Sequence, residues 1–124
     1  MGADFAYVGS AFIATEEARA PEAYKQMIVQ GMAQDIVYSN LFTGVHGNYL
    51  RGSIAAAGLD PDHLPEGDPS KMDFAAAVGG AKAWKDIWGC GQGIGAVDAV
   101  TSTAELVARL RREYQAARER LALC

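Results

Sequence analysis

The residues with the clearest chemical potential lie near the start of the chain, in the run Val8-Gly9-Ser10-Ala11-Phe12. A short stretch of β-forming residues is followed there by glycine, a hydroxyl residue and a helical pattern. This order suits a phosphate, because glycine lets the backbone approach an anion while helix-start amides and the serine hydroxyl donate to it. In parallel α/β barrels such a site follows the seventh and eighth strands. On these residues alone a plain turn is the commoner explanation, since Gly-Ser after a short strand occurs widely.

A second candidate segment is Trp88-Gly89-Cys90-Gly91-Gln92-Gly93-Ile94-Gly95, with glycine at every second position. Neither a helix nor an ordinary strand favours that spacing, so we predict a loop that lies close against another group. The amide of Gln92 either reaches a flat ring system or a substrate, or it stays exposed in a tight turn.

The histidines and cysteines offer weaker candidates. His46 lies in a loop with glycines, where an imidazole can carry or relay a proton near neutral pH. The alternative is a loop histidine bonded to backbone or water, and His63 is expected to be a solvated surface residue. Cys90 and Cys124 have no CxxC or HxxxH spacing beside them, so we predict neither a disulfide framework nor a metal site.

Composition narrows the class of protein. The chain has 124 residues, half of them hydrophobic, and a net charge of −4, which argues against nucleic acid or an anionic membrane as a partner. The first residues lack the pattern of a signal peptide, and no apolar run approaches the roughly 18 residues of a membrane helix. We therefore expect a soluble protein in a reducing, cytoplasmic setting.

The helices, strands and loops that would position these residues are predicted from hydrophobic periodicity and from the positions of glycine, proline and capping residues. We predict a short strand at residues 4–8 and a helical region, capped by Thr15, at residues 15–32. A second strand is predicted at residues 35–39. Residues 40–48 predict a loop and 49–57 a helix that Gly58 terminates. Residues 60–72 read as an irregular connector, and the alanine-rich residues 73–88 as partly helical.

The last predicted element is a helix that begins after Ser102, with Glu105 completing a capping box. Its buried face is predicted to comprise Leu106, Val107, Leu110, Tyr114, Ala117 and Leu121. On its outer face Glu105–Arg109 and Arg109–Glu113 are spaced as helical ion pairs. One good strand with no long second strand makes a self-contained sheet doubtful.

Three segments resemble the nitronate monooxygenase family, formerly called 2-nitropropane dioxygenases. Residues 2–17, GADFAYVGSAFIATEE, are similar to the family's last-strand pattern GADAVxxGTxFxxTxE. Ser10 stands where the family usually has threonine, which keeps the hydroxyl, and Tyr7 stands where many members have glutamine. Residues 35–51 are similar to a region of the form SGRPARGxxN, and residues 87–95 to the loop xxWSAGQxxGLI. The three motifs occur in the family order.

The resemblance implies the C-terminal part of an α/β fold, a (β/α)8 TIM barrel that binds flavin mononucleotide (FMN). It implies that residues 1–16 form the last barrel strand and phosphate-binding turn, 17–87 a helical insertion subdomain, 88–100 an active-site loop and 101–124 the closing barrel helix. On this mapping the cofactor-binding residues are Tyr7, Val8, Gly9, Ser10 and Gln92, and His46 is the candidate catalytic residue. The family oxidises alkyl nitronates with molecular oxygen. Its histidine base belongs to an upstream motif, AGGHxG, which this chain lacks.

Three functional alternatives stay open at this point. The first is a nitronate monooxygenase in which the remaining barrel, typically about 250 residues in all, comes from a missing segment or a homo-oligomer. The second is an NAD(P)H-dependent flavin quinone or enoyl reductase of the same barrel type, whose glycine loops look similar. The third, of another class, is a catalytically inactive truncated helical fragment.

Overall fold

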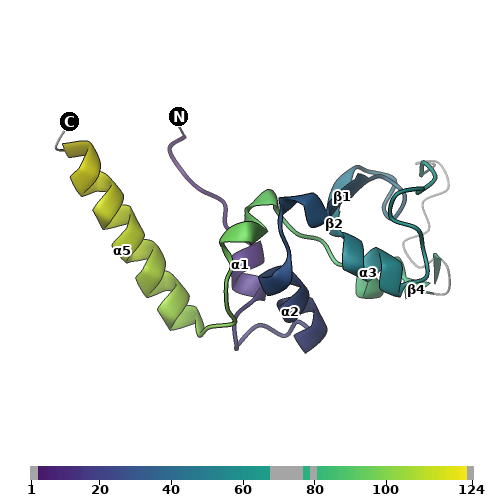
Figure 1. The fold of residues 1–124 in the computed structure, drawn as a ribbon, viewed down its shortest axis with the longest axis horizontal. Coiled ribbons are helices and arrows are strands. Elements are labelled where there is room, and N and C mark those ends of the chain that lie inside the picture. The colour runs from purple at the N-terminus through teal and green to yellow at the C-terminus, as the bar shows by residue number, and fades with distance from the viewer. Residues whose placement is uncertain (1–2, 68–76, 79–80, 123–124) are drawn as a thin grey trace.

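The computed structural model describes residues 3–67, 77–78 and 81–122. Helices separate two short strand pairs, and no larger sheet forms among these residues (Figure 1). In chain order the elements are α1 (Ser10–Ile13), α2 (Glu22–Gln30), the 3-10 turn η1 (Ala33–Asp35), β1 (Ile36–Ser39), β2 (Gly47–Leu50), α3 (Arg51–Ala56), β3 (Ala77–Val78), β4 (Ala81–Lys82), α4 (Ala83–Asp86), the 3-10 helix η3 (Gln92–Ala96) and α5 (Thr103–Ala122).

The first hairpin joins β1 and β2 in antiparallel register, from Ile36 opposite Leu50 to Ser39 opposite Gly47. Gly44, in the connecting loop, has a φ of 73°, a left-handed conformation that glycine adopts without steric cost. α3 follows β2 directly and ends before Gly58. This glycine has a φ of 81°, and its amide donates a hydrogen bond to the Ala55 carbonyl, as is typical of a glycine that terminates a helix.

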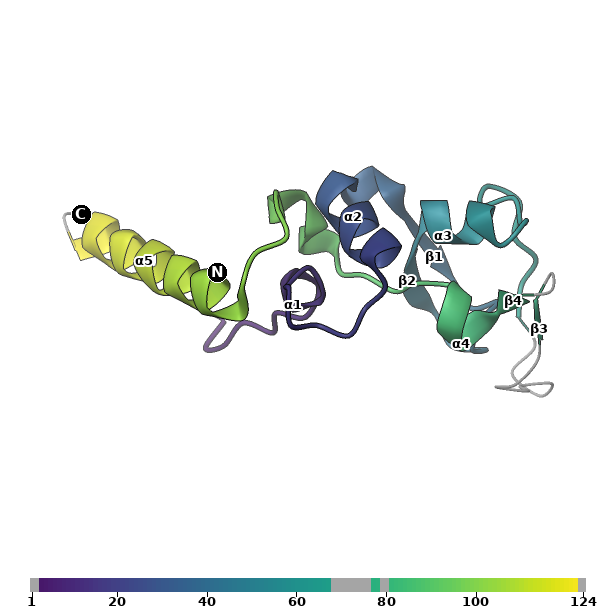
Figure 2. The ribbon, with the colours of Figure 1, turned by 90° about the horizontal axis from the view of Figure 1, so that it is seen from below.

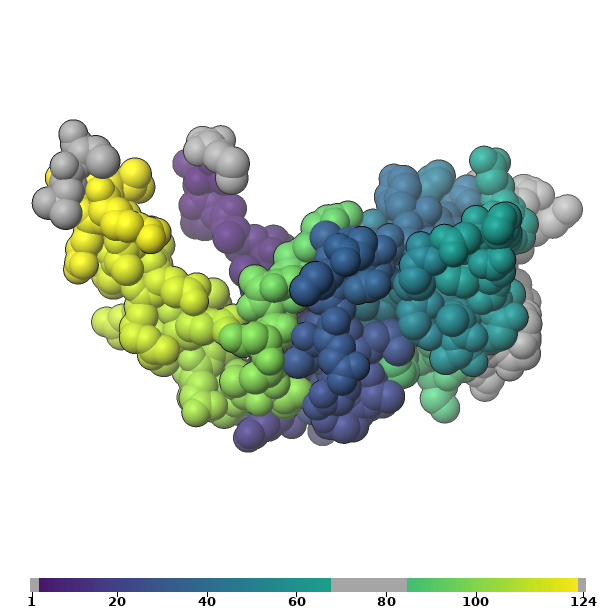
Figure 3. Space-filling view, viewed as in Figure 1, coloured from purple at the N-terminus to yellow at the C-terminus, as the bar shows by residue number. Residues whose placement is uncertain are grey.

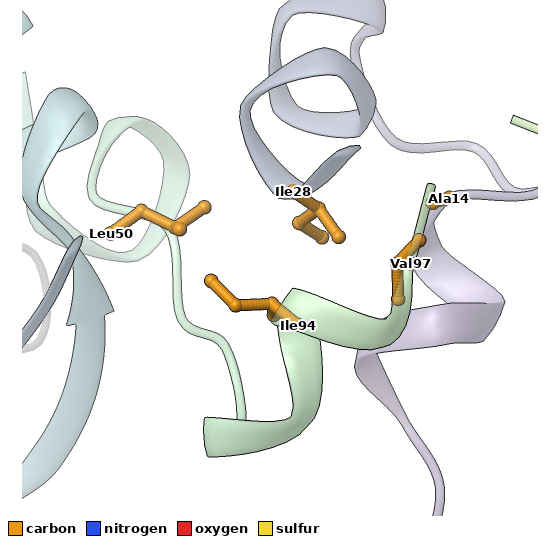
Figure 4. Packing of buried hydrophobic residues seen from close by; sticks show 5 residues of the cluster. All are labelled: Ala14, Ile28, Leu50, Ile94 and Val97. Carbon is orange, nitrogen blue, oxygen red and sulfur yellow. The ribbon is translucent and has the colours of Figure 1, made fainter. Parts of the chain in front are cut away.

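The main hydrophobic core lies where α2, β2 and η3 meet the end of α1. Figure 4 shows its side chains converging from these separate elements. Ile28 and Ile94 are fully buried at its centre, and Gly31 packs so closely that a β-carbon there would lie 3.0 Å from Ile94 Cδ1. The complete cluster is Ala14, Ile28, Leu50, Ile94 and Val97. A second cluster beneath the hairpin comprises Phe42, Ile54 and Ile87.

α5 extends away from the other described elements, and Figure 2 shows its full length. The predicted capping box is confirmed, because the Glu105 amide donates to Ser102 Oγ at 3.2 Å and the Ser102 amide donates to Glu105 Oε2 at 3.1 Å. The predicted buried face is wrong for most of its length. Leu106 is buried, but Val107, Tyr114 and Leu121 are exposed, since none of the other described elements covers them.

Several predicted elements have different bounds. Residues 4–8 form no strand, and Phe5 and Tyr7 are almost fully exposed. The helical region predicted for 15–32 starts only at Glu22, because the Thr15 hydroxyl donates back to the Phe12 carbonyl at 2.8 Å instead of capping a helix. The strand predicted for 35–39 is confirmed, whereas residues 49–50 belong to β2 and not to the following helix.

The prediction of partial helix for the alanine-rich region is corrected in part. Within residues 73–88 the described residues form β3, β4 and the single turn α4, while residues 73–76 and 79–80 lie outside the described residues, as do residues 68–72 of the predicted connector. None of the described helices has both the length and the hydrophobicity needed to cross a lipid bilayer.

Candidate functional site

The two glycine segments picked out in the sequence meet in space. The Gly91 amide donates a hydrogen bond to Ser10 Oγ at 2.7 Å, across 81 positions of the chain. Beside this bond lies a pocket of about 350 Å³, within the size range of small-molecule sites. Its walls are the N-terminal segment, the glycine loop with η3, and the first turns of α5, and a hollow between the N-terminal segment and α5 is visible in Figure 3. It contains all five predicted cofactor-binding residues: Tyr7, Val8, Gly9, Ser10 and Gln92.

Ser10 opens α1 and leaves hydrogen-bonding capacity for a ligand. Gly9 is the N-cap residue and no side chain caps this helix, while the Gly9 carbonyl accepts from the amides of Phe12 and Ile13. The first-turn amides of Ser10 and Ala11 have no intrahelical acceptor, as at any helix start. The Ser10 oxygen accepts from Gly91, so its own proton is free to be donated. This donor set suits an anionic oxygen.

Glycine at position 9 is not required by the described chain itself. Gly9 has a φ of −115°, and a β-carbon there would meet Tyr7 Cε1 at an ordinary 3.9 Å. At Gly93 a β-carbon would meet nothing within 4 Å. The open space at both glycines leaves room for a group from outside the chain to approach the backbone.

The base of the glycine loop is firmly anchored to the helical region. The Leu50 amide donates to the Trp88 carbonyl at 2.8 Å, and the Trp88 amide donates to the buried Ser53 hydroxyl at 3.0 Å. Ile94, at the other end of the loop in η3, is fully buried in the core. The exposed residues from Gly91 to Gly93 therefore project from a fixed base.

Burial shifts the pKa of two ionisable groups where the glycine loop joins the core, Cys90 and Tyr24. It raises the pKa of the Cys90 thiol to about 11 and also raises the pKa of the Tyr24 phenol, with the nearby Cys90 as a smaller cause. Both groups therefore stay protonated at neutral pH. A protonated thiol is a poor nucleophile, so the structure supports no nucleophilic role for Cys90.

Sequence reasoning missed the third wall of the pocket, which α5 supplies. Arg109 lines the pocket and donates to Asp98 at 3.2 Å, and its Nε lies 3.6 Å from a Glu113 carboxylate oxygen. That Nε is buried without a hydrogen bond, since the Glu113 contact is within ion-pair range but too long for a well-formed bond. The i,i+4 spacing predicted the Arg109–Glu113 pair but gave no sign that it faces a pocket.

The structure does not bring His46 to this pocket. Its exposed ring stacks on Tyr38 with 4.7 Å between ring centroids, beside a different surface hollow formed with residues of the 61–66 connector. The predicted proton-carrying role of His46 beside the cofactor therefore gains no geometric support. His63 is exposed and lies 2.8 Å from Asp60, as expected of a surface residue. Across the described ranges, no group of three or more His, Cys, Asp or Glu side chains is arranged to hold a metal ion.

Comparison with known structures identifies the class of fold. A point mutant of FabK from Thermotoga maritima superposes with a TM-score of 0.60 at 21% identity, over 92% of this chain and 34% of that chain. The helices and the two short two-stranded sheets of the described residues are consistent with part of a TIM barrel.

Comparison with curated proteins gives a more particular relative. The chain is 29% identical over 126 aligned residues to a nitronate monooxygenase from Paraburkholderia phytofirmans, an oxidoreductase by its name. The match covers 98% of this chain, which spans about a third, 34%, of the relative's length. The resemblance to nitronate monooxygenases indicated by the three motifs is thereby confirmed. No protein-family model matches the chain.

Proposed function

We propose that this chain forms part of an FMN-dependent nitronate monooxygenase, in which it supplies one side of the cofactor's phosphate site. The observation that carries the proposal is the hydrogen bond from Gly91 to Ser10, because it joins two family-like motifs at one pocket. The similarity to a nitronate monooxygenase over almost the whole chain supports the substrate class.

The residues present fit the phosphate end of FMN. The free first-turn amides of α1 and the Ser10 proton are the donors that would hold the phosphate, and the space at Gly9 and Gly93 allows close approach. Gln92 is exposed at the pocket and would present its amide to the remainder of the cofactor or to substrate. When bound, FMN would supply the redox chemistry for passing electrons from an alkyl nitronate to molecular oxygen. We expect the catalytic base to lie outside this chain, because the family's histidine motif has no match in it.

The test uses a complete enzyme that contains this chain. It is expected to purify yellow and to consume oxygen when propyl nitronate is added. A Ser10→Ala variant should lose flavin in parallel with activity, whereas Ser10→Thr, which keeps the hydroxyl, should retain both. A colourless enzyme that consumes no oxygen with nitronates would refute the proposal.

A second candidate is an NAD(P)H-dependent flavin quinone or enoyl reductase. The observation that favours it is the fold shared with FabK, together with the likeness of the glycine loop to such reductases. Anaerobic addition of NADH or NADPH separates the candidates. Rapid bleaching of the flavin without any nitronate supports the reductase, and bleaching by propyl nitronate alone supports the monooxygenase.

We also propose that the 124-residue chain alone binds FMN weakly and is catalytically inactive. Phe5 and Tyr7 in the N-terminal segment and Tyr114 on α5 expose large apolar surface that a longer enzyme would cover. Flavin titration with light scattering on the purified chain is expected to show weak binding and association. Tight one-to-one FMN binding by a monodisperse chain would contradict this.

A further inference from the structure

Tyr24 connects α2 to the glycine loop through two kinds of contact. Its ring stacks on Trp88, with 4.9 Å between centroids and 11° between planes, and its hydroxyl donates to the Gly89 carbonyl. The side chain is half-buried and belongs to none of the motifs that resemble the family. It lies outside the pocket, so it does not touch a ligand there.

The peptide group between Gly89 and Cys90 is held at both ends. Its carbonyl accepts from the Tyr24 hydroxyl, and its amide donates to the Asn48 carbonyl at 3.2 Å. The carbonyl and amide of a trans peptide point in opposite directions, so bonds at both ends fix the orientation of the plane. The next amide along the chain is that of Gly91, which donates to Ser10.

We propose that Tyr24 is a positioning residue of the flavin site, acting through the Gly89–Cys90 peptide group to hold Gly91 and Gln92 in place. The flavin part of this inference rests on the proposed function, whereas the positioning of Gly91 does not. Glycine on both sides of Cys90 leaves the loop free to rotate when an anchor is lost. Removing the hydroxyl also leaves a half-buried carbonyl without its partner, which is more costly than the net value of the bond.

The first test needs no flavin. In the complete enzyme before flavin is added, Tyr24→Phe keeps the stacked ring and removes only the hydroxyl, and we expect hydrogen exchange at the Gly91 amide to accelerate about fivefold. Tyr38→Phe is the matched control, because the Tyr38 side chain is 70% exposed and its ring stacks on His46 and not on the glycine loop. It should leave Gly91 exchange unchanged.

A double-variant comparison distinguishes positioning from general loosening. Once Ser10→Ala has removed the acceptor of the Gly91 amide, adding Tyr24→Phe should accelerate that amide no further. Equal acceleration in both backgrounds, or no acceleration in either, would overturn the inference. Exchange at the buried core amide of Ile28 reports on the fold and should stay within twofold of the unsubstituted chain.

The second test uses the complete enzyme. Tyr24→Phe should raise the dissociation constant for FMN about fivefold, while Tyr38→Phe leaves it unchanged. If the parent enzyme binds no flavin, the proposed function fails while Gly91 exchange still decides the structural role. If the parent binds flavin and Tyr24→Phe binds it equally well, the positioning inference fails and the proposed function stands.

Discussion

The Ser10 hydroxyl oxygen and the Gly91 amide lie 2.7 Å apart, and this one bond joins the start of α1 to the glycine loop. Each segment alone has an ordinary explanation as a turn. Together they border a pocket that contains every residue predicted to bind cofactor, although the role of these residues stays a prediction.

Replacing Ser10 with alanine is expected to weaken FMN binding by about tenfold, because hydrogen bonds to charged groups are among the stronger ones. Ser10→Thr should bind within about twofold of the parent. Fluorescence titration of the complete enzyme measures both affinities, and riboflavin serves as a ligand without phosphate. An equal loss for riboflavin and FMN would show that Ser10 acts on the fold and not on phosphate.

Ile94→Ala is expected to destabilise the chain by about 2–4 kcal/mol, because Ile94 of η3 is fully buried in the core with Ile28 of α2 and Leu50 of β2. Urea unfolding followed by circular dichroism measures this change. Val107→Ala is the control, since Val107 is half exposed on α5 and its truncation should change stability by no more than about 0.5 kcal/mol. Similar losses for the two variants would contradict the described core.

The carboxylate of Glu17 caps α5 from outside the helix. Both of its oxygens accept from the Thr103 amide, at 2.9 and 3.1 Å, and this bond is the main cause that lowers the pKa of Glu17 below its ordinary 4.5. A carboxyl with a lowered pKa stabilises the fold above the ordinary value and loses that contribution as the pH falls through its folded pKa.

Glu17→Gln should therefore lower the melting temperature at neutral pH, and the difference from the parent chain should vanish in acid below the folded pKa. Differential scanning calorimetry across the acid range checks this trend. Glu119→Gln, an exposed carboxyl on α5, controls for the loss of one negative charge. A difference that persists at the lowest pH would show that the cap acts without its charge.

Cys90 should react slowly with iodoacetamide. Its pKa of about 11, raised from 9.0 by burial, leaves about a hundredfold less thiolate at pH 8 than an ordinary cysteine has. Mass spectrometry of the Cys90 peptide follows the reaction, with the chain unfolded in urea as the reference. Equal rates in the folded and unfolded chain would contradict the burial of this thiol.

Local signals predicted the start of α5, the end of α3 and the first hairpin's opening strand, but not the start of α2. The capping box at Ser102 and the terminating glycine at Gly58 both depend on bonds within a few residues, so a sequence pattern contains them in full. The prediction that one face of α5 is buried was wrong, because burial depends on what packs against a helix and not on the spacing of its apolar residues. Val107 and Tyr114 have the right spacing but no cover among the described elements.

The candidate site, too, could be predicted from the sequence only in part. The glycines beside Ser10 and Gln92 indicated loops of close approach, and the family resemblance then led to the prediction that these residues bind cofactor. Arg109 was missed because its place on the pocket wall follows from the angle at which α5 leaves the body. The strand predicted for residues 4–8 lacks partners among the described elements, and a strand needs neighbours to bond its backbone.

The position of the cofactor's phosphate in a crystal structure of the complete FMN-loaded enzyme is the measurement closest to the central claim. We expect phosphate oxygens within hydrogen-bonding distance of the Ser10 hydroxyl and the first amides of α1, with Gly91 still bonded to Ser10. A phosphate bound on other elements, with the pocket between residues 7–10 and 91–93 filled by protein side chains, would contradict the proposal.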